Sequence, residues 1–168
     1  MERVCFTMRV DPQHLDTYVA MHANTWPELL DGLHRTGWEN YSLFLRADGF
    51  LIGYVESSDW ARSSREMQEL PVSPLWSIEM DRLVVPGSTM DYLPLAAARG
   101  QHVPGARRVA ALALSDELPD WASVAVFRSV GGASVIYGEI EGEDTSGLPT
   151  DEFVEVFNLD EQLARISH

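Results

Sequence analysis

The pattern of hydrophobic and polar positions changes period several times along residues 3–82, which predicts an alternation of strands and helices. Residues 3–10 carry an apolar side chain at every second position, as a half-buried strand does. Asp11 and the proline after it predict a helix start, because Asp accepts hydrogen bonds from free amides and proline fits the first turn. In the helix that follows, Tyr18 and His22 are one helical turn apart, so we expect them on one face.

Pro27 interrupts this helix, because a proline inside a helix removes an amide donor and clashes with the preceding turn. The residues around it predict a new helix start at the break. Thr25 and Glu28 have the spacing of a capping box, with Thr25 as the N-cap. A second helical segment can then run to Gly37, which is a suitable C-terminal stop.

The rest of this half predicts a hairpin followed by two helices. In the first strand, over 38–45, alternation places Tyr41 and Leu43 on one face and Trp38 on the other. The elements expected after it are a turn at Asp48-Gly49, a strand over 50–56, a helix over 60–70 capped at Ser58-Asp59 and ended by Pro71, and a helix from Ser73.

Residues 3–82 therefore have the order β-α-β-β-α, which lacks one strand of a ferredoxin-like β-α-β-β-α-β unit. Two stretches can supply that strand: 153–159, near the C-terminus, and 90–95, which Pro94 restricts to a sheet edge. We expect an α+β fold in which helices cover one face of an antiparallel sheet. The other face is most simply buried against a second copy, so we expect a homodimer.

The character of the sequence changes between residues 84 and 148. A connector rich in Gly, Pro and Ala leads into strand-like runs over 108–114, 122–129 and 133–141. We therefore divide the chain into an α+β unit, formed by 1–82 with about 150–160, and an additional three-stranded β segment within 84–148. The strands of this segment could cover the open sheet face within one chain, in place of a second copy.

The added segment faintly repeats the first half. Its RRVAALALSDE resembles the N-terminal ERVCFTMRVDP, and its SVAVFRSVGGASVIYGEIEGED resembles SLFLRADGFLIGYVESSD. Two interpretations stay open. The segment is a degenerate repeat that has lost its helices, or strands separated by Gly turns resemble one another by chance.

Composition and charge restrict the partners. Of 168 residues, 45% are hydrophobic, which is enough for a packed core, and the net charge is −14. An acidic surface disfavours binding to nucleic acid and to anionic membranes, but it permits a neutral ligand such as a sugar. Cys5 is the single cysteine, and neither a signal peptide nor a membrane-spanning run is apparent, so we expect a cytoplasmic protein.

His22 is the strongest candidate for chemistry, because an imidazole with an ordinary pKa of about 6.5 can give and take protons near neutrality. Tyr18 and Tyr41 can offer hydroxyl groups. The alternative is a half-buried histidine beside ordinary core aromatics. The chain lacks GxSxG, HExxH and a phosphate-binding Gly-rich loop, so a nucleophilic hydrolase or a metal enzyme has little support.

Residues 1–82 resemble the L-rhamnose mutarotases, small dimeric α/β-barrel proteins that interconvert the anomers of a pyranose. The resemblance rests on RVCFTMRVDP, YVAMHANTWPELLDGL, GWENYSLFLRADGFLIGYVE and LWSIEM, and it resumes at FVEVFNLD near the C-terminus. Some members have paired tryptophans where this chain has Trp76 followed by Ser77. The departure leaves the identity of the sugar open.

The resemblance implies roles for individual residues. His22 matches the proton donor of the family and would be the principal acid and base. Tyr41 and Tyr18 would orient the sugar or relay protons, and Trp76 would pack against it. Opening and closing a cyclic hemiacetal needs an acid and a base but no redox cofactor or metal, so we expect a small neutral sugar as the ligand and no cofactor.

Two other functions fit the same residues. A cofactor-free monooxygenase of the same α/β-barrel architecture could use the histidine and tyrosines on a phenol, although the Trp-Pro-Glu after His22 favours a mutarotase. The second alternative is not an enzyme but a non-catalytic sugar-binding module, in which the added segment would occlude the cavity or form an interface. One fold can serve all three.

Overall fold

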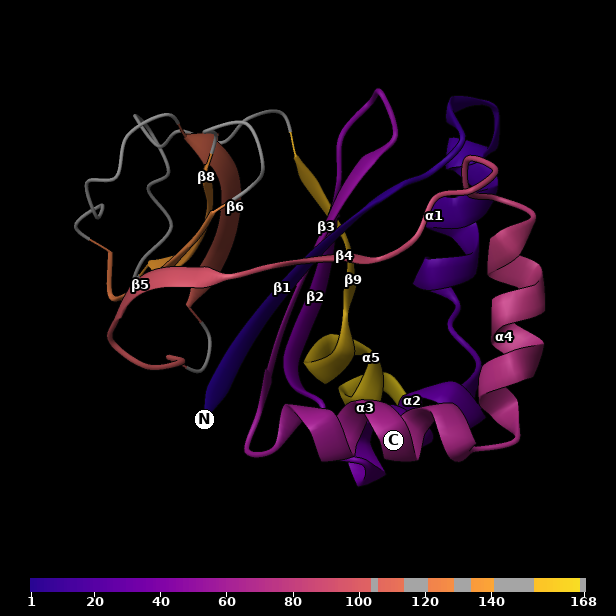
Figure 1. Cartoon of the computed structure of the whole chain (residues 1–168). Helices are drawn as coiled ribbons and strands as arrows, with labels where there is room; N and C mark the ends of the chain where they lie inside the picture. The colour runs from indigo at the N-terminus through magenta and orange to yellow at the C-terminus, as the bar shows by residue number, and fades with distance from the viewer. Residues whose placement is uncertain (104–105, 114–120, 129–133, 141–152, 167–168) are drawn as a thin grey trace.

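The computed structural model describes residues 1–103, 106–113, 121–128, 134–140 and 153–166. Two antiparallel sheets pack face to face, and helices cover the outer face of the first sheet (Figure 1). This arrangement confirms the α+β class. Among the described residues, no helix is long and apolar enough to cross a membrane.

The first sheet has five strands in the order β4-β1-β3-β2-β9. Their bounds are β1 Glu2–Arg9, β2 Glu39–Leu45, β3 Phe50–Ser57, β4 Asp91–Leu93 and β9 Val154–Asn158. Both stretches considered for the missing strand join this sheet: β4 pairs with β1 and β9 pairs with β2. Both edges of the β1-β3-β2 core are therefore extended by strands distant in sequence.

The helices up to residue 81 begin close to their predicted starts, with the cap of α2 as the exception, and the C-terminal helix was not predicted. Their bounds are η1 Pro12–His14, α1 Leu15–Ala23, α2 Pro27–Arg35, α3 Trp60–Glu69, α4 Val72–Asp81 and α5 Leu159–Ile166. Asp11 accepts from the backbone amide of Gln13, and Asp59 accepts from that of Arg62, as expected of N-caps. These helices pack onto one face of the first sheet and bury Leu30 between them.

The predicted capping box at Thr25 is wrong. The residue before α2 is Trp26, and no side chain caps the helix there. Thr25 instead donates its hydroxyl hydrogen to the carbonyl oxygen of His22, 2.8 Å away. Thr25 therefore satisfies the end of α1 and not the start of α2, where Pro27 lacks an amide hydrogen in any case.

A β-bulge at the start of β2 overturns the predicted facing of Trp38. Pairing between β2 and β3 shifts register between Glu39 and Ser42, and Asn40 has a φ of 49°, in the left-handed region. The extra residue rotates the chain, so Trp38 and Tyr41 come to the same face with ring centroids 4.9 Å apart. Simple alternation could not predict this, because a bulge breaks the period of two.

The second sheet has the order β5-β7-β8-β6. Its strands are β5 Leu95–Arg99, β6 Arg107–Ala113, β7 Ser123–Arg128 and β8 Ser134–Ile140. The last three correspond to the predicted runs over 108–114, 122–129 and 133–141, whose end residues 114, 129, 133 and 141 lie outside the described residues. The predicted end of the added segment at 148 and the predicted start of the closing stretch at about 150 lie outside the described residues as well.

The face of the first sheet that we expected to meet a second copy is covered by the second sheet. Cys5, Phe44, Ile52 and Tyr54 of the first sheet form one buried apolar cluster with residues of the second. The residues contributed by the second sheet are Ala125, Phe127, Val135 and Tyr137, all buried. The intramolecular cover considered above as the exception to a homodimer is therefore present.

Candidate functional site

A cavity of about 470 Å³ lies between the first sheet and its helices. All four residues singled out from the sequence line it: Tyr18 and His22 from α1, Tyr41 from β2 and Trp76 from α4. The helical layer that forms one wall is at the right of Figure 1, away from the second sheet. Three separate elements thus bring together side chains that are as much as 58 positions apart (76 − 18) in the chain.

Tyr18 and His22 lie one above the other on α1, as the helical spacing predicts. Their rings stack with centroids 4.1 Å apart. The Nδ1 atom of His22 lies 2.8 Å from the carbonyl oxygen of Tyr18. Because a carbonyl oxygen can only accept, Nδ1 carries a proton and donates it, which leaves Nε2 as an acceptor in the neutral ring.

Burial changes the acid–base character of His22. The side chain is only 5% exposed. Desolvation lowers the pKa of His22 from 6.5 to about 4, partly opposed by the hydrogen bond to Tyr18. The imidazole is therefore neutral at pH 7, with Nε2 able to accept a proton. This corrects the starting assumption of an ordinary pKa that permits either role near neutrality.

The helix break after α1 holds His22 in place. Its carbonyl oxygen accepts hydrogen bonds from the hydroxyl of Thr25 and from the side-chain amide of Gln162 on α5. These donors satisfy a carbonyl at a helix end, where the next turn is missing. The C-terminal helix thus fixes the backbone of a residue 140 positions earlier.

Aromatic rings form the walls of the cavity around His22. Trp76 presents an edge-to-face contact to the imidazole at 5.4 Å and a similar contact to Trp26 at 5.0 Å. Phe157 of β9 completes the wall, 6.1 Å from His22 and 5.2 Å from Tyr41. Such a lining suits a ligand with apolar C–H faces and few charges.

Three tyrosines line the cavity: Tyr18 from α1, Tyr41 from β2 and Tyr92 from β4. Burial raises the pKa of Tyr41, and the neighbouring Tyr92 raises it further. Burial, and then Tyr41, likewise raises the pKa of Tyr18. All three phenols therefore stay protonated at neutral pH and are available as hydrogen-bond donors.

Sequence reasoning missed two residues that line the cavity, Tyr92 and Phe157, and one that supports it from outside, Gln162. Tyr92 sits in a stretch recognised only as a possible edge strand, and Phe157 in one recognised only as a closing strand. Both stretches could have been examined for inward-facing aromatics once placed in the sheet. Gln162 gives no signal in the sequence, because its role depends on how α5 docks against α1.

The fold and the cavity define an α+β protein with an aromatic-lined cavity that contains a buried, neutral imidazole and protonated phenols. The sequence model of the L-rhamnose mutarotase family matches residues 3–102. The chain belongs to this family. The relatives described next are named L-rhamnose mutarotase, which is a carbohydrate isomerase.

Two sequence relatives agree with this assignment. An L-rhamnose mutarotase of Jannaschia sp. (strain CCS1) is 36% identical over 76 residues, which is 45% of this chain and 69% of the relative. That of Oceanobacillus iheyensis is 36% identical over 77 residues, 45% of this chain and 73% of the relative. A solved structure of an L-rhamnose mutarotase from Formosa agariphila aligns with a TM-score of 0.48 and 22% identity, over 58% of this chain and 97% of that one.

Proposed function

We propose that the protein is a cofactor-independent mutarotase that interconverts the α and β anomers of a deoxy-pyranose such as L-rhamnose. One observation carries the proposal: Tyr18, His22, Tyr41 and Trp76, brought from three elements, line one cavity of a size that suits a monosaccharide. Membership of the family supports the same activity.

Mutarotation moves one proton and makes no net redox change. A base removes the proton of the anomeric hydroxyl, the bond between C1 and the ring oxygen breaks, and the ring oxygen receives a proton. The resulting open-chain aldehyde rotates about the C1–C2 bond, and the ring oxygen adds to the other face of the carbonyl. The same transfers in reverse then give the other anomer.

His22 would carry this proton. Its Nδ1 is committed to the carbonyl oxygen of Tyr18, so Nε2 is the atom that accepts the anomeric proton. The imidazolium formed there has an acidic proton, because burial lowers the pKa of His22 to about 4, and it readily delivers that proton to the ring oxygen. One residue thus serves as base and then as acid in a single turnover.

Tyr41 and Tyr18 would hold the sugar by donating hydrogen bonds. Since burial raises the pKa of both phenols, they stay protonated and stabilise the charge that develops on the ring oxygen without losing their own proton. Trp76 supplies an apolar surface for the C–H face of the ring. Ser77 beside it lines the same cavity with a small side chain, which leaves room for a substituent.

We also propose that the catalytic unit extends beyond residues 1–82 and about 150–160. Ser88, Met90 and Tyr92 line the cavity, and β4 pairs with β1 in the first sheet. The border between the catalytic unit and the added β segment therefore falls after β4 and not before residue 84.

The activity can be measured by NMR saturation transfer between the two anomeric protons of L-rhamnose. Wild-type protein is expected to accelerate exchange. His22→Asn, which keeps a donor near the position of Nδ1 but lacks Nε2, is expected to lose about 10²–10⁴ in rate. His34→Asn is the matched control, because it makes the same change at an exposed histidine of α2.

Each alternative function predicts its own experimental outcome. Sugar binding without acceleration by folded wild-type protein would identify a non-catalytic binding module. Oxygen consumption with a quinol would identify the monooxygenase. An unchanged rate in His22→Asn would remove the histidine from the mechanism even if the wild type is active.

A further inference from the structure

The second sheet repeats the strand order and the register of the first. The order β6-β8-β7 corresponds to β1-β3-β2, with an additional strand beside β7 as there is beside β2. In the first sheet Arg3 pairs with Glu56 across β1 and β3, and in the second Arg108 pairs with Glu139 across β6 and β8. Identical residue types thus occupy equivalent ladder positions in the two sheets.

The hairpins agree in the same way. Phe44 pairs with Ile52 across β2 and β3, and Phe127 pairs with Val135 across β7 and β8. Phe44 and Phe127, like Tyr54 and Tyr137 and like Glu56 and Glu139, are separated by the same 83 positions (127 − 44, 137 − 54 and 139 − 56). A common spacing across a whole hairpin favours a repeat over chance similarity, and so decides between the two interpretations left open from the sequence.

The contacts between the two sheets are reciprocal. Tyr54 stacks on its equivalent Tyr137 with centroids 3.5 Å apart and rings 8° from parallel. Phe44 contacts Tyr137 at 6.2 Å, and the equivalent pair, Tyr54 and Phe127, is also 6.2 Å apart. In an interface between identical subunits related by a two-fold axis, residue i contacts j and j contacts i, and a residue on the axis contacts its own copy. The two sheets of this chain follow that rule.

Polar contacts fix the packing of the two sheets. Asn40 in β2 donates to a carboxylate oxygen of the buried Glu139 at 2.9 Å. Arg3 in β1 donates to the carbonyl oxygen of Val124 at 3.0 Å. His102, between β5 and β6 of the second sheet, lies 2.6 Å from the same carboxylate as Asn40. These bonds are directional, so they select one placement of the second sheet on the first.

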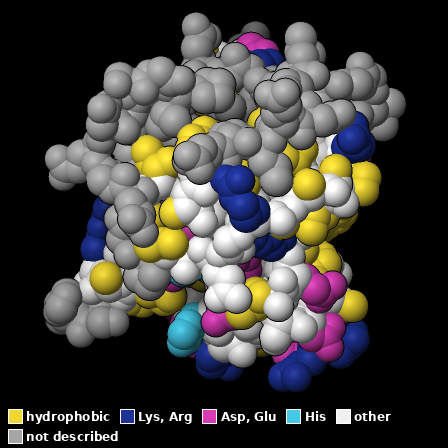
Figure 2. Space-filling model, turned by 90° about the vertical axis from the view of Figure 1, so that its left-hand side faces the viewer, with side chains coloured by type: hydrophobic (Ala, Val, Ile, Leu, Met, Phe, Trp, Pro, Cys, Tyr) yellow, Lys and Arg dark blue, Asp and Glu magenta, His cyan; other side chains and the backbone are white. Residues whose placement is uncertain are grey.

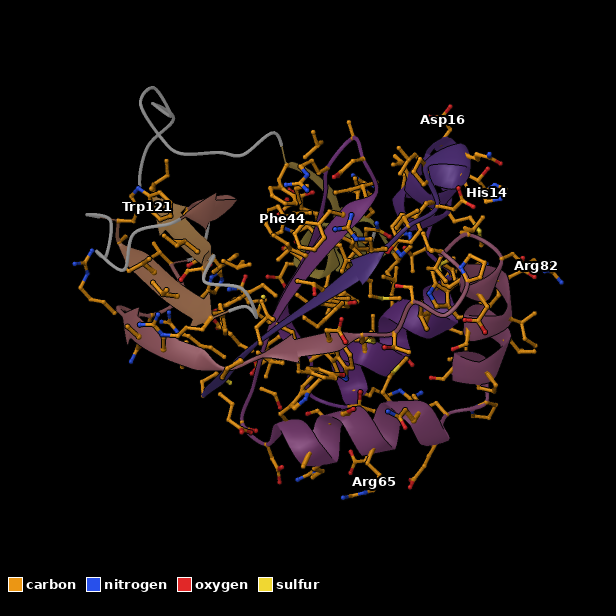
Figure 3. All side chains as sticks on the ribbon, turned by 45° about the horizontal axis from the view of Figure 1, so that its top comes forward. His14, Asp16, Phe44, Arg65, Arg82 and Trp121 are labelled. Atoms are coloured by element: carbon orange, nitrogen blue, oxygen red, sulfur yellow. The ribbon has the colours of Figure 1, made fainter. Side chains whose placement is uncertain are left out.

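The outer faces of the two sheets differ. The first is covered by helices that carry His22, whereas on the second Trp121 packs with Val124, Val126, Ile136 and Ile140. The Trp121 ring lies directly on Gly138, where an added Cβ would come within 1.7 Å of it. Figure 2 views this side, and Figure 3 labels Trp121 on it, far from His14 and Arg82 beside the helices. Among the described residues, the helices and His22 lie on the side of the first sheet.

We infer that the second sheet is a degenerate copy of the first that occupies the position of a second subunit, so that the chain is a monomer with an internal two-fold pairing and a single active cavity. The surface recognised is the β1-β3-β2 face, and its partner is the β6-β8-β7 face of the same chain. Residues of β1, β2 and β3 and residues of β7 and β8 are buried against one another in one apolar cluster, so the described part of this interface is already occupied. This replaces the homodimer expected from the sequence.

Two measurements on the full chain test the inference. Light scattering coupled to size-exclusion chromatography should give the mass of one chain, 18.8 kDa, over a wide range of protein concentration. The thermal midpoint should likewise not change with concentration, whereas that of a dimer rises with it. A mass of two chains would overturn the inference, and this test needs no substitution.

A cross-linking experiment shows which chain covers the face. Phe127→p-benzoylphenylalanine places a photoreactive aromatic ring near Tyr54. Unlabelled and ¹⁵N-labelled chains are mixed, unfolded together and refolded. The mixture is then irradiated and digested. Links between β7 and the first sheet should join peptides of one isotope only, and mixed-isotope pairs would overturn the inference. The same replacement at Tyr92, which is half exposed, measures links formed by random collision.

Discussion

The Nδ1 atom of His22 donates a hydrogen bond to the carbonyl oxygen of Tyr18 across one turn of α1. This single bond decides which nitrogen can accept a proton from a ligand. Burial has the second effect, because it lowers the pKa of His22 to about 4 and keeps the ring neutral at physiological pH. The neutral imidazole can therefore accept a proton only at Nε2, because Nδ1 already carries one.

The catalysed exchange rate should therefore follow the neutral form of His22. As pH rises through about 4 the rate should increase, and above about 6 it should stay level through neutrality. The measurement is the pH profile of L-rhamnose exchange after subtraction of the rate without protein. A rate that falls between pH 6 and 8 would contradict this prediction, because it would mean that the protonated imidazole is the active form in the free enzyme.

Stability should depend on pH through the same residue. The unfolded chain binds a proton at His22 below a pKa of 6.5, while the folded chain does so only below about 4. Between these values the unfolded state binds more protons, so the free energy of unfolding falls as pH decreases through this window. The full effect is roughly 3 kcal/mol at acid pH.

Urea unfolding of wild type and His22→Asn at a series of pH values isolates this contribution. Other titrating groups cancel in the difference between the two proteins. The stability of His22→Asn relative to wild type should improve as pH falls from 6.5 toward 4. A difference that is independent of pH would show that the imidazole is not buried in its neutral form.

The local part of the site follows from the sequence, whereas the long-range part does not. The stacking of Tyr18 on His22 follows from helical spacing, and the start at Asp11 follows from capping chemistry. The contact of Gln162 with the carbonyl of His22 depends on the docking of a C-terminal helix, which no local pattern records. The resemblance to a family, and not periodicity, placed Trp76 beside them.

The sequence predicted the wrong contacts for two residues, Thr25 and Trp38. Thr25 has the spacing of an N-cap, yet its hydroxyl serves the end of the preceding helix. Trp38 was expected to face away from Tyr41, but the bulge at Asn40 brings both rings to one side. Both cases involve a backbone that departs from its regular period, which residue spacing alone cannot detect.

Trp76→Ala should weaken sugar binding more than it slows the chemical step. The indole edge contacts His22 and forms one wall of the cavity, but it carries no proton in the mechanism. Loss of its apolar surface should raise KM about tenfold, equivalent to about 1.4 kcal/mol, with a smaller change in kcat. Leu75→Ala is the matched control on α4, because Leu75 is 57% exposed. Equal KM values for the two variants would show that the indole does not contact the sugar.

Asn40 should contribute to stability in two separable ways. Its φ of 49° favours glycine, and its side chain donates to Glu139. Burial would raise the pKa of Glu139, but hydrogen bonds from His102, the Val103 amide, Asn40 and Tyr137 outweigh this and lower it. The carboxylate is therefore ionised, and removing one donor should cost about 2 kcal/mol.

Asn40→Gly loses the side-chain bond but keeps the backbone freedom, so it should lower the free energy of unfolding by about 2 kcal/mol. Asn40→Ala loses both, and should cost about 1–2 kcal/mol more. Because Tyr41 is the next residue, the alanine variant should also lose more exchange activity than the glycine variant. Urea unfolding and the NMR assay on both proteins provide the comparison. If Asn40→Ala were as stable and as active as Asn40→Gly, the left-handed bulge would have no part in holding Tyr41 in the cavity.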